Sequence, residues 1–480
     1  MKTSSYKDRP LAVDLDGTLT LTDTLHESIV AFLRYSPFMF YKLLYWLFLG
    51  RAAFKAKLAS SLDLDAVSLP YNQPLIEWLK EERRKGRKIV LCTAANEGVA
   101  QSVANYLQLF DEVIASNPTN NLKGKNKREA LQQRFGIKGY DYVGNSEVDL
   151  EVWSGAAGAI VVNANDGVLK KAARASVVIK VFPRDLITLS QAASLIRVHQ
   201  WLKNLLIFVP ILAAHNFDNF QAVLTLLLAF MSFSLCASAV YVTNDLFDLV
   251  NDRRHPRKCN RPFASGAASL RLGFILAPTL IFTSFCLALL VGSNFTVVLS
   301  IYFLLTLCYT LWLKKLALVD CLTLAGLYTL RIAAGAAAIY LKLSFWLLAF
   351  SVFIFLSLAF VKRFAELQIQ FDVGSTVVHG RGYSVADAPL VQNLGVTAGY
   401  AAVLVLALYL DSDAIQNLYQ VPELIWLAIP LMLFWISWMW LSAARGRMHD
   451  DPIVFAMKDR ASLCVGVLTL FSFGLASIGT

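Results

Sequence analysis

The stretch Tyr241-Val-Thr-Asn-Asp-Leu-Phe-Asp-Leu-Val-Asn-Asp-Arg-Arg-His-Pro-Arg-Lys-Cys-Asn-Arg-Pro262 follows directly on a long apolar run, residues 224–242. On a helix, its carboxylates at spacings i, i+3 and i+7 form one narrow stripe, with an amide, Asn244, at its flank. Such close carboxylates repel one another unless a cation lies between them, and Mg²⁺ is held in this way together with substrate phosphates. The stretch therefore predicts a magnesium–phosphate site where a membrane helix emerges, at Asp245, Asp248 and Asp252.

Cationic side chains follow the acids within ten residues: Arg253, Arg254, Arg257, Lys258 and Arg261. Guanidinium and ammonium groups are suited to phosphate oxygens. The alternative interpretation is a solvated loop whose charges have no chemical role. The regular spacing of the acids favours the phosphate site.

The pattern Asn-Asp-x-x-Asp-x-x-x-Asp at 244–252 resembles the first aspartate-rich motif of the UbiA-type membrane prenyltransferase superfamily. The tail His-Pro-x-Lys-x-x-Arg-Pro at 255–262 is similar to one branch, the decaprenyl-phosphate phosphoribosyltransferases. This resemblance implies that the acids hold a Mg²⁺-diphosphate and that Lys258 and Arg261 bind phosphate.

The composition is that of a polytopic membrane protein, with 56% hydrophobic and 16% charged residues in 480. The net charge of +10 is spread over the chain and predicts no nucleic-acid-binding stripe. The N-terminus lacks the apolar core of a signal peptide, so we expect the first domain to stay in the cytoplasm.

Nine apolar stretches beyond residue 195 are long enough to span a bilayer, and nine is the helix number that the UbiA resemblance implies. Loops on one side of these spans hold 15 Lys and Arg residues, whereas the other side holds only Lys342. The positive-inside rule then predicts a cytoplasmic basic face and an external C-terminus. The expected spans are 196–214, 220–242, 270–291, 295–313, 318–340, 343–361, 393–410, 422–441 and 461–478.

Polar side chains within or beside these spans are candidate phosphate ligands. The first span opens with Arg-x-x-Gln-Trp-x-Lys-Asn at 197–204, which resembles the opening motif of the family, and the fifth contains Arg331. Aromatic prenyltransferases of the superfamily carry a second aspartate-rich motif near the end of the sixth span, where this chain has basic residues instead. Lipid-headgroup contact and an ordinary basic flank are the alternative interpretations. The candidates are Arg197, Lys203, Asn204, Arg331, Lys362, Arg363, Glu366 and Arg381.

The N-terminal part contains Asp-Leu-Asp-Gly-Thr at 14–18 after a short apolar strand. This resembles the first motif of the haloacid dehalogenase superfamily, which implies Asp14 as a nucleophile and Asp16 as an acid/base. Later elements match in order: Thr93 as the phosphate-binding hydroxyl, and Lys127, with Lys123 and Lys125 as rivals, as the phosphate-neutralising lysine. We therefore expect a doubly wound α/β domain with a helical cap at about 20–86.

The acidic loop after Gly144 departs from this family, because Asn145 stands where an aspartate is usual and Asp149 keeps the second acid. The resemblance implies Mg²⁺ held by Asp14, Asp16, Asn145 and Asp149, more weakly than with an aspartate at 145. An active phosphatase and a weakened or structural domain both stay open. The cap contains an aromatic run at 37–50, which predicts either a helix lying at a membrane interface or a buried cap helix.

These patterns predict a phosphatase-like domain at 1–190 and a transmembrane transferase domain at 191–480. The predicted reaction is Mg²⁺-dependent transfer of 5-phosphoribose from phosphoribosyl pyrophosphate to a polyprenyl phosphate at the inner membrane, followed by removal of the 5-phosphate. The alternatives are prenyl transfer to an aromatic acceptor, a phosphatase on a membrane platform, and a transporter or scaffold.

Overall fold

The computed structural model forms two compact units, Met1–Ile196 with Tyr241–Ala277, and Arg197–Val240 with Pro278–Thr480. Residues 241–277 thus group with the N-terminal part of the chain, although they follow the first long apolar helix. The residues that the structure describes are 9–36, 39–50, 54, 57–58, 61, 64–117, 121–184, 186–215, 218–372, 382–412, 415, 419–448 and 451–478.

A parallel sheet of six strands in the order β3-β2-β1-β4-β5-β6 forms the centre of the first unit. The strands are short and rich in Val, Ile and Ala because helices cover both faces of the sheet. This arrangement confirms the predicted doubly wound α/β fold. The strands are β1 (Leu11–Val13), β2 (Ile89–Asn96), β3 (Glu112–Ser116), β4 (Asp141–Gly144), β5 (Gly158–Val162) and β6 (Val177–Phe182).

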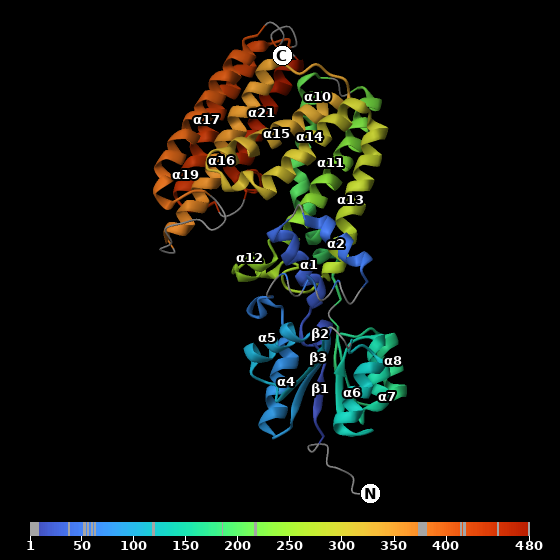
Figure 1. The fold of residues 1–480 in the computed structure, drawn as a ribbon. Helices are drawn as coiled ribbons and strands as arrows, with labels where there is room; N and C mark the ends of the chain where they lie inside the picture. The colour runs from blue at the N-terminus through green and yellow to red at the C-terminus, as the bar shows by residue number, and fades with distance from the viewer. Residues whose placement is uncertain are drawn as a thin grey trace. The chain divides into compact units, whose positions relative to one another are not determined.

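Alternate residues of β1 point to opposite faces of the sheet and into two separate cores. Leu11 and Val13 pack with α4 (Gln73–Arg84) and α5 (Glu97–Leu107). Ala12 packs in the other core, with α6 (Lys125–Phe135), α7 (Leu150–Gly155) and α8 (Asp166–Ala175), so three layers result (Figure 1). Chain order reverses on either side of β1, which makes its carboxyl end the expected place for a ligand.

The cap between β1 and α4 includes two helices, α1 (Thr24–Tyr35) and α2 (Phe40–Phe48). The Asp23 carboxylate caps α1 by accepting hydrogen bonds from the backbone N–H groups of Leu25 and His26. The two helices share a small apolar cluster in which Phe32 of α1 packs against Trp46 of α2, with ring centroids 5.2 Å apart.

Residues 241–277 contribute the end of α11 (Phe220–Phe247), the short α12 (Leu249–Arg254) and the start of α13 (Leu270–Val291) to the first unit. The loop before α13 approaches the chain just after β1. Gly266 has a φ of +80°, and a Cβ there would lie 2.6 Å from Cβ of Leu21. Only glycine permits both the backbone conformation and the close approach.

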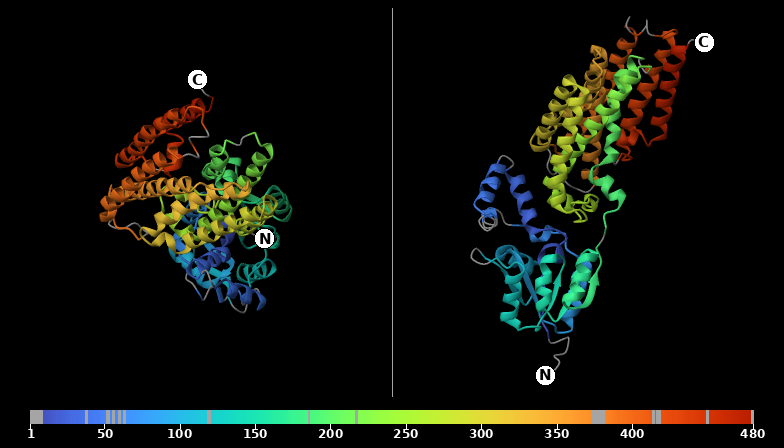
Figure 2. Two further views of the ribbon diagram at one scale, coloured as in Figure 1. Left: turned by 90° about the horizontal axis from the view of Figure 1, so that it is seen from above. Right: turned by 90° about the vertical axis from the view of Figure 1, so that its right-hand side faces the viewer.

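The second unit is helical (Figures 1 and 2), and its long helices have the mean hydropathy of membrane-spanning segments. Within the described part of the chain, eight helices are long and apolar enough to cross a membrane, and up to nine if residues 189–195 and 198–213 count as one broken span. The predicted polytopic helical fold is therefore confirmed. The remaining long helices are α14 (Ser293–Leu311), α15 (Val319–Ala338), α16 (Phe345–Asp372), α17 (Ala388–Leu410), α19 (Ala428–Ala444) and α21 (Arg460–Ile478).

Helices α15, α16, α17 and α19 share the largest apolar core of this unit. Close approach depends on Gly395 of α17, because a Cβ there would lie 2.2 Å from the Trp440 ring of α19. The Ser357 hydroxyl of α16 donates to the Gly395 carbonyl at 2.7 Å and accepts from the Trp440 indole N–H at 3.2 Å. Small and polar residues of this kind hold helices together where no water competes for hydrogen bonds.

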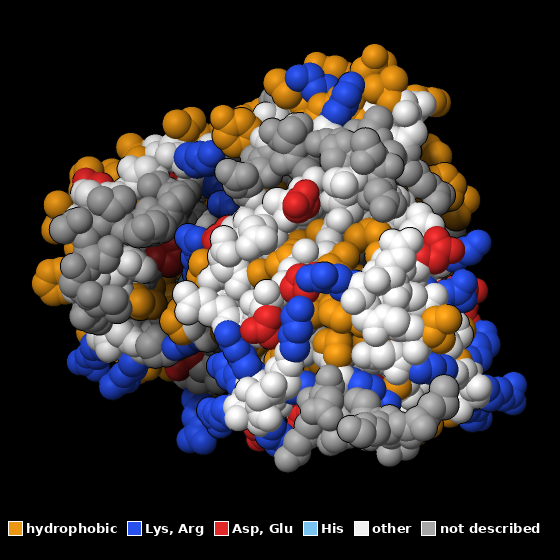
Figure 3. All heavy atoms as spheres, turned by 60° about the horizontal axis from the view of Figure 1, so that its bottom comes forward, with side chains coloured by type: hydrophobic (Ala, Val, Ile, Leu, Met, Phe, Trp, Pro, Cys, Tyr) orange, Lys and Arg blue, Asp and Glu red, His pale blue; other side chains and the backbone are white. Residues whose placement is uncertain are grey.

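Charged side chains occupy many separate places on the face drawn in Figure 3. Lys and Arg residues lie there among acidic, polar and apolar side chains and form no continuous stripe on that face.

Candidate active sites

The first candidate site lies at the carboxyl end of β1, where Asp14 and Lys127 meet. Asp14 directly follows the strand, and Lys127 projects from the first turn of α6. The Lys127 Nζ donates to Asp14 Oδ1 at 2.8 Å and to the Tyr142 hydroxyl at 2.9 Å. All three side chains are buried. Of the three lysines considered from the sequence, Lys127 is therefore the one that the structure shows bound to Asp14.

Tyr142 connects this pair to Asp149. Its hydroxyl donates to Asp149 Oδ1 at 2.8 Å, while Asp149 Oδ2 accepts from the backbone N–H groups of Asn145 and Ser146 at 3.0 and 2.9 Å and from the Ser146 hydroxyl at 2.9 Å. Three of these four donors reach Oδ2 and one reaches Oδ1, so both carboxylate oxygens are engaged and Oδ2 fully so. Asp149 thus fixes the turn that carries Asn145.

Asn145 lies against the turn after Asp16. Gly17 has a φ of +73°, and a Cβ there would stand 2.2 Å from the Asn145 amide nitrogen. The Asp16 carboxylate accepts the backbone N–H of Thr24, the first residue of α1, at 2.8 Å. This hydrogen bond joins Asp16, which follows the central strand β1, directly to the cap.

The environment raises the pKa of both acids after β1. Burial raises the pKa of Asp14 to about 6, against the opposing effect of Lys127. Burial, reinforced by the Asp23 carboxylate, raises the pKa of Asp16 to about 7. Asp14 is then mostly ionised at neutral pH, as a nucleophile must be, and Asp16 exchanges a proton readily near neutrality, as an acid/base must.

A cavity of about 80 Å³ separates core and cap beside these acids. Thr93, at the end of β2, is fully buried, and its hydroxyl oxygen accepts the Ala95 N–H at 3.0 Å. Ala95, two residues after Thr93, lines the cavity, whereas Thr93 itself does not. The residues that line the cavity are Asp16, Asp23, Thr24, Leu25, Ser28, Leu58, Ala95, Asn96 and Val99.

The donor set here is compatible with one Mg²⁺. Among the described residues, no group of three or more His, Cys, Asp or Glu side chains could hold a metal ion by itself. Mg²⁺ commonly takes only one or two carboxylates and completes its shell with water and substrate phosphate. Asp14 and Asp16, with the Asn145 amide, meet that requirement, whereas the Asp149 oxygens are already engaged.

The second candidate site is the acidic segment at the end of α11 and in α12. Asp245 and Asp252 are buried, and one nitrogen, Nη1 of Arg261, lies 3.1 Å from Asp245 Oδ1 and 2.6 Å from Asp252 Oδ2. Asn244 and Asp248 lie on the same segment and are half-buried. Burial raises the pKa of Asp252, although Arg261 opposes this shift.

In this structure the Arg261 guanidinium is therefore the cation that lies between the two carboxylates. The sequence predicts Arg261 as a phosphate ligand, whereas in this structure its guanidinium neutralises the acids. Carboxylate and amide oxygens are the donors that Mg²⁺ prefers, so Asp245 and Asp252, with Asn244 and Asp248 on the same segment, would hold Mg²⁺, and Arg261 would then be available to an anionic ligand.

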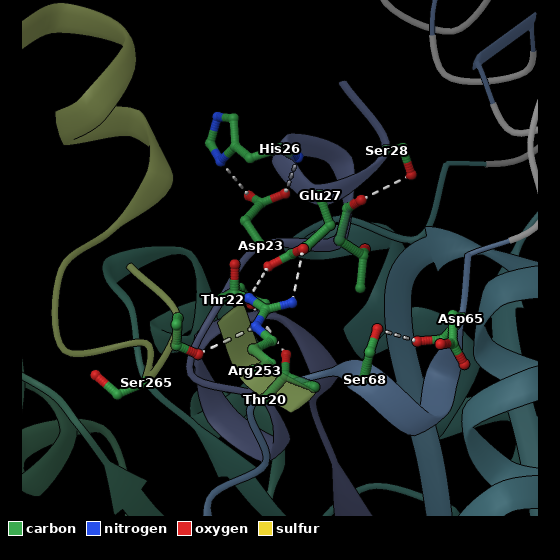
Figure 4. Close-up of polar contacts among 12 residues, drawn as sticks. Thr20, Thr22, Asp23, His26, Glu27, Ser28, Asp65, Ser68, Arg253 and Ser265 are labelled. Atoms are coloured by element: carbon green, nitrogen blue, oxygen red, sulfur yellow. Dashed lines mark hydrogen bonds and ion pairs between the residues drawn. The ribbon is translucent and has the colours of Figure 1, made fainter. Parts of the chain in front are cut away.

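A buried ion pair joins this segment to the cap within the first unit (Figure 4). The Arg253 guanidinium donates to both Glu27 oxygens, at 3.0 and 2.6 Å, and to the Ala264 carbonyl at 3.0 Å. Nearby, Arg254 pairs with Asp65 at 2.8 Å on the surface. The two bases that follow Asp252 are thus structural partners of the cap.

The third cluster lies in the second unit around Asp451. Its Oδ2 is 2.6 Å from Lys203 Nζ and 3.2 Å from Lys362 Nζ, and the Tyr328 hydroxyl also lies 3.3 Å from the carboxylate. Burial would raise the pKa of Asp451, but Lys362 and Lys203 outweigh it and hold that pKa well below its usual range. The two lysines are drawn together at one carboxylate and form a cationic site.

Two other predicted ligands are engaged inside the same unit. The Arg331 Nε donates to the Asn204 side-chain oxygen at 2.9 Å, and its Nη2 donates to the Tyr302 hydroxyl at 3.2 Å. Arg363 is fully buried, forms an ion pair with Asp320 at 2.6 Å, and also contacts Glu366. These arginines hold helices together in this structure.

Two of the remaining predicted ligands, Arg197 and Lys258, are less buried. Arg197 is half-buried and has a φ of +52° at the start of the second unit. Lys258 begins a short 3-10 helix, Lys258–Asn260. Arg381 lies outside the described residues.

Sequence reasoning missed three residues that complete these clusters, namely Tyr142, Glu27 and Asp451. Asp451 offered a signal, since it lies in a loop that is otherwise rich in Arg and Lys. Tyr142 resembles an ordinary buried strand residue, and Glu27 resembles an ordinary polar residue of a helix.

The first unit has carboxylates beside a lysine at the end of a parallel α/β sheet, as hydrolases of this architecture do. The second unit is a polytopic helical domain with clustered cations. Together these features indicate a membrane-bound enzyme with a hydrolase-like domain. The chain belongs to the UbiA prenyltransferase family, whose model matches residues 205–458. The model of haloacid dehalogenase-like hydrolases matches residues 11–153. The chain is thus a multi-pass membrane transferase with a haloacid dehalogenase-like domain.

Relatives align over nearly the whole chain or over somewhat more than half of it. The chain is 36% identical to the uncharacterised protein y4nM of Sinorhizobium fredii over 471 residues, 97% of this chain and 91% of that protein. It is 37% identical to nodulation protein NoeC of Azorhizobium caulinodans, over 57% of this chain and 89% of that protein. It is 30% identical to decaprenyl-phosphate phosphoribosyltransferase of Mycobacterium tuberculosis, over 58% of this chain and 92% of that protein.

Proposed function

We propose that the membrane domain transfers 5-phosphoribose from phosphoribosyl pyrophosphate to a polyprenyl phosphate, with Mg²⁺ as cofactor. The observation that carries this proposal is the cationic cluster around Asp451. Lys362, with Arg363 and Glu366, stands where aromatic prenyltransferases of the superfamily have a second aspartate-rich motif, and Lys362 shares its carboxylate partner with Lys203. One acidic segment plus a cationic cluster suits two phosphorylated reactants.

The similarity to a decaprenyl-phosphate phosphoribosyltransferase supports the same choice of substrates. So does the sequence His255-Pro-Arg-Lys-Cys-Asn-Arg-Pro262. A site for a prenyl diphosphate and a neutral aromatic acceptor would need a second acidic cluster more than it would need these lysines.

The transfer itself needs no general base. A phosphate oxygen of the polyprenyl phosphate attacks C1 of the ribose, the bond from C1 to the pyrophosphate oxygen breaks, and pyrophosphate leaves with the bonding electron pair. When bound, Mg²⁺ would neutralise the negative charge that builds on the departing pyrophosphate. Asn244, Asp245, Asp248 and Asp252 would hold the magnesium diphosphate.

The cationic side chains would orient the two phosphorylated reactants. In the first unit we assign phosphate binding to Lys258 and Arg261. In the second unit we assign it to Arg197, Lys203, Lys362 and Arg381, with Asn204, Arg331, Arg363 and Glu366 as positioning residues. The buried hydrogen bonds of Arg331 and Arg363 support a positioning role for these two.

The N-terminal domain would then remove the 5-phosphate from the lipid product. The Asp14 carboxylate attacks phosphorus, the bond to the ribose oxygen breaks, and Asp16 protonates that oxygen. Water then hydrolyses the aspartyl phosphate, with Asp16 accepting its proton. Lys127 and Thr93 would neutralise and bind the phosphate, and a shared chain raises the effective concentration of the product at the second site.

Both steps would take place at the cytoplasmic face of the inner membrane. The excess of Lys and Arg in the loops 243–271, 314–317, 362–392 and 442–460 supports this orientation. The lipid product of such a reaction would be an activated donor of the pentose.

Two labelled donors test the proposal. The purified chain in lipid vesicles is supplied with polyprenyl phosphate, Mg²⁺, ribose-labelled phosphoribosyl pyrophosphate, and a prenyl diphosphate with an aromatic acceptor. We expect label from ribose in the lipid fraction, lost in Asp252→Asn and retained in the matched exposed variant Asp218→Asn. Consumption of the prenyl diphosphate alone would instead establish aromatic prenyl transfer.

A further inference from the structure

Helix α2 of the cap exposes an unusual number of large apolar side chains. Phe40, Tyr41, Leu44, Tyr45, Leu47 and Phe48 are all more than half exposed, and none of the nine residues of Phe40–Phe48 is buried. Soluble surfaces seldom leave so many aromatic and aliphatic groups adjacent to one another, because water penalises contiguous apolar area.

The helix is nevertheless held firmly on the cap by its other side. Leu43 and Trp46, one turn apart, pack against the buried Phe32, Phe54 and Leu58. The exposed residues are therefore not the result of a detached segment. Helix α2 therefore has two apolar faces. One face, with Leu43 and Trp46, packs on the cap, and the other is exposed.

The membrane-spanning helices of this chain provide the internal comparison. Phe282 and Leu289 of α13, on a helix apolar enough to span a bilayer, are 72% and 70% exposed, and Phe48 of α2 is 91% exposed. In α13 such exposure means contact with lipid. Nine residues rise only about 14 Å, less than half of a bilayer core, so α2 cannot span and must lie along the surface.

We propose that α2 is an interfacial membrane helix that inserts its apolar face among the lipids of the bilayer that this chain spans. Aromatic residues favour the headgroup boundary, and the single charge of the helix, Lys42, suits anionic lipid. Residues 39–50 contain no acidic side chain that would oppose this contact.

The location of α2 gives this contact a consequence for the phosphatase-like site. Leu58 belongs to the cluster that holds α2, and it also lines the cavity of about 80 Å³ beside Asp16. A cap anchored at the bilayer surface would present that cavity to phosphates carried by lipids. This second step rests on the proposed function, whereas the membrane contact itself does not.

Fluorescence quenching in bilayers tests the contact directly. In the full chain with Cys259, Cys286, Cys308 and Cys464 changed to Ser, the variants Phe48→Cys and Gln101→Cys are each labelled with an environment-sensitive dye. Both are reconstituted into nanodiscs of phosphatidylcholine and phosphatidylglycerol with nitroxide lipids. We expect several-fold stronger quenching at position 48 than at position 101, which is exposed on α5 of the sheet domain.

Equal quenching at the two positions would overturn the proposal. A blue-shifted label at position 48 that nitroxide lipids do not quench would also overturn it and would indicate a protein partner or a second copy. A double variant, Leu44→Glu with Phe48→Glu, tests separately whether the membrane contact affects the use of lipid-linked substrates. This double variant should raise the KM for a lipid phosphate in vesicles several-fold and leave hydrolysis of soluble p-nitrophenyl phosphate unaffected. If the labelled Phe48→Cys variant is quenched as expected but the double variant has an unchanged KM, only the role in substrate access is refuted.

Discussion

Arg253 and Glu27 form a buried ion pair with two hydrogen bonds, although 226 residues separate them in the sequence. Arg253 follows Asp252 of the transferase motif, and Glu27 lies on α1, whose first N–H group is bonded to Asp16 of the phosphatase-like site. Parts of both candidate sites therefore belong to one packed unit, linked by the contacts from Asp16 through α1 to Arg253.

Breaking this pair should destabilise the first unit strongly. Glu27→Ala leaves the Arg253 guanidinium buried without its carboxylate, which costs about 3–5 kcal/mol. Arg254→Gln is the matched control, because the Arg254–Asp65 pair is exposed and should contribute no more than about 1 kcal/mol. Hydrogen exchange of residues 245–265 measures the effect, and equal protection in the two variants would contradict it.

Gly17→Ala should inactivate the phosphatase-like site. The left-handed backbone costs an alanine about 1–2 kcal/mol, and the new Cβ would also displace the Asn145 amide, only 2.2 Å away. Gly86→Ala has a similar φ of +83° with open space around it, so it should cost comparable stability and leave turnover intact. Phosphate release from a soluble phosphomonoester distinguishes the two variants, and similar activity in both would show that the Asn145 position is unimportant.

Asn145→Asp should tighten the binding of Mg²⁺ to this site. The added carboxylate supplies charge to a set that otherwise depends on Asp14 and Asp16, and affinity for hard cations rises with the number of charged ligands. The Mg²⁺ concentration for half-maximal phosphatase activity should fall about tenfold, an order-of-magnitude expectation for one added charge. An unchanged requirement would place position 145 outside the metal shell.

The three clusters differ in how far the sequence predicts them. The acids after β1 and the spacing of the acids at 245–252 are visible in local patterns, whereas Lys127 is indicated only by the resemblance to the haloacid dehalogenase superfamily, with Lys123 and Lys125 as rivals. The helix expected over 245–252 is interrupted at Asp248, between α11 and α12. The role of Arg261 is not visible in a local pattern, since its choice between phosphate and carboxylate depends on whether a metal ion is present. Glu27 and Asp451 depend on contacts between distant segments, which no local pattern encodes.

The grouping of residues 241–277 with the sheet domain was also beyond prediction. Apolar periodicity identifies α11 and α13 as spans, but it does not show that the loop between them packs at Leu21 and Glu27. The close approach at Gly266 and the ion pairs Arg253–Glu27 and Arg254–Asp65 contribute to this packing, and each of them joins residues far apart in the sequence.

Because of Asp451, the second unit should become less stable at acid pH. Lys362 and Lys203 hold its folded-state pKa below the value of about 3.9 expected in the unfolded chain. Its contribution is therefore fully present above about pH 4 and is lost as the pH falls through the lower folded-state pKa. Thermal unfolding in detergent should show this loss in the wild type and in Asp218→Asn, but not in Asp451→Asn, which starts less stable at pH 7.

The most direct test of the account is the fate of labelled ribose. Membranes containing the chain, polyprenyl phosphate and Mg²⁺ are given ribose-labelled phosphoribosyl pyrophosphate, and the lipid fraction is counted and analysed. The account predicts labelled lipid that disappears with a chelator, falls about 100-fold or more in Asp252→Asn, and retains its 5-phosphate only when Asp14 is changed to Asn. Undiminished labelling in Asp252→Asn, or label that never enters lipid while a prenyl diphosphate is consumed, would contradict it.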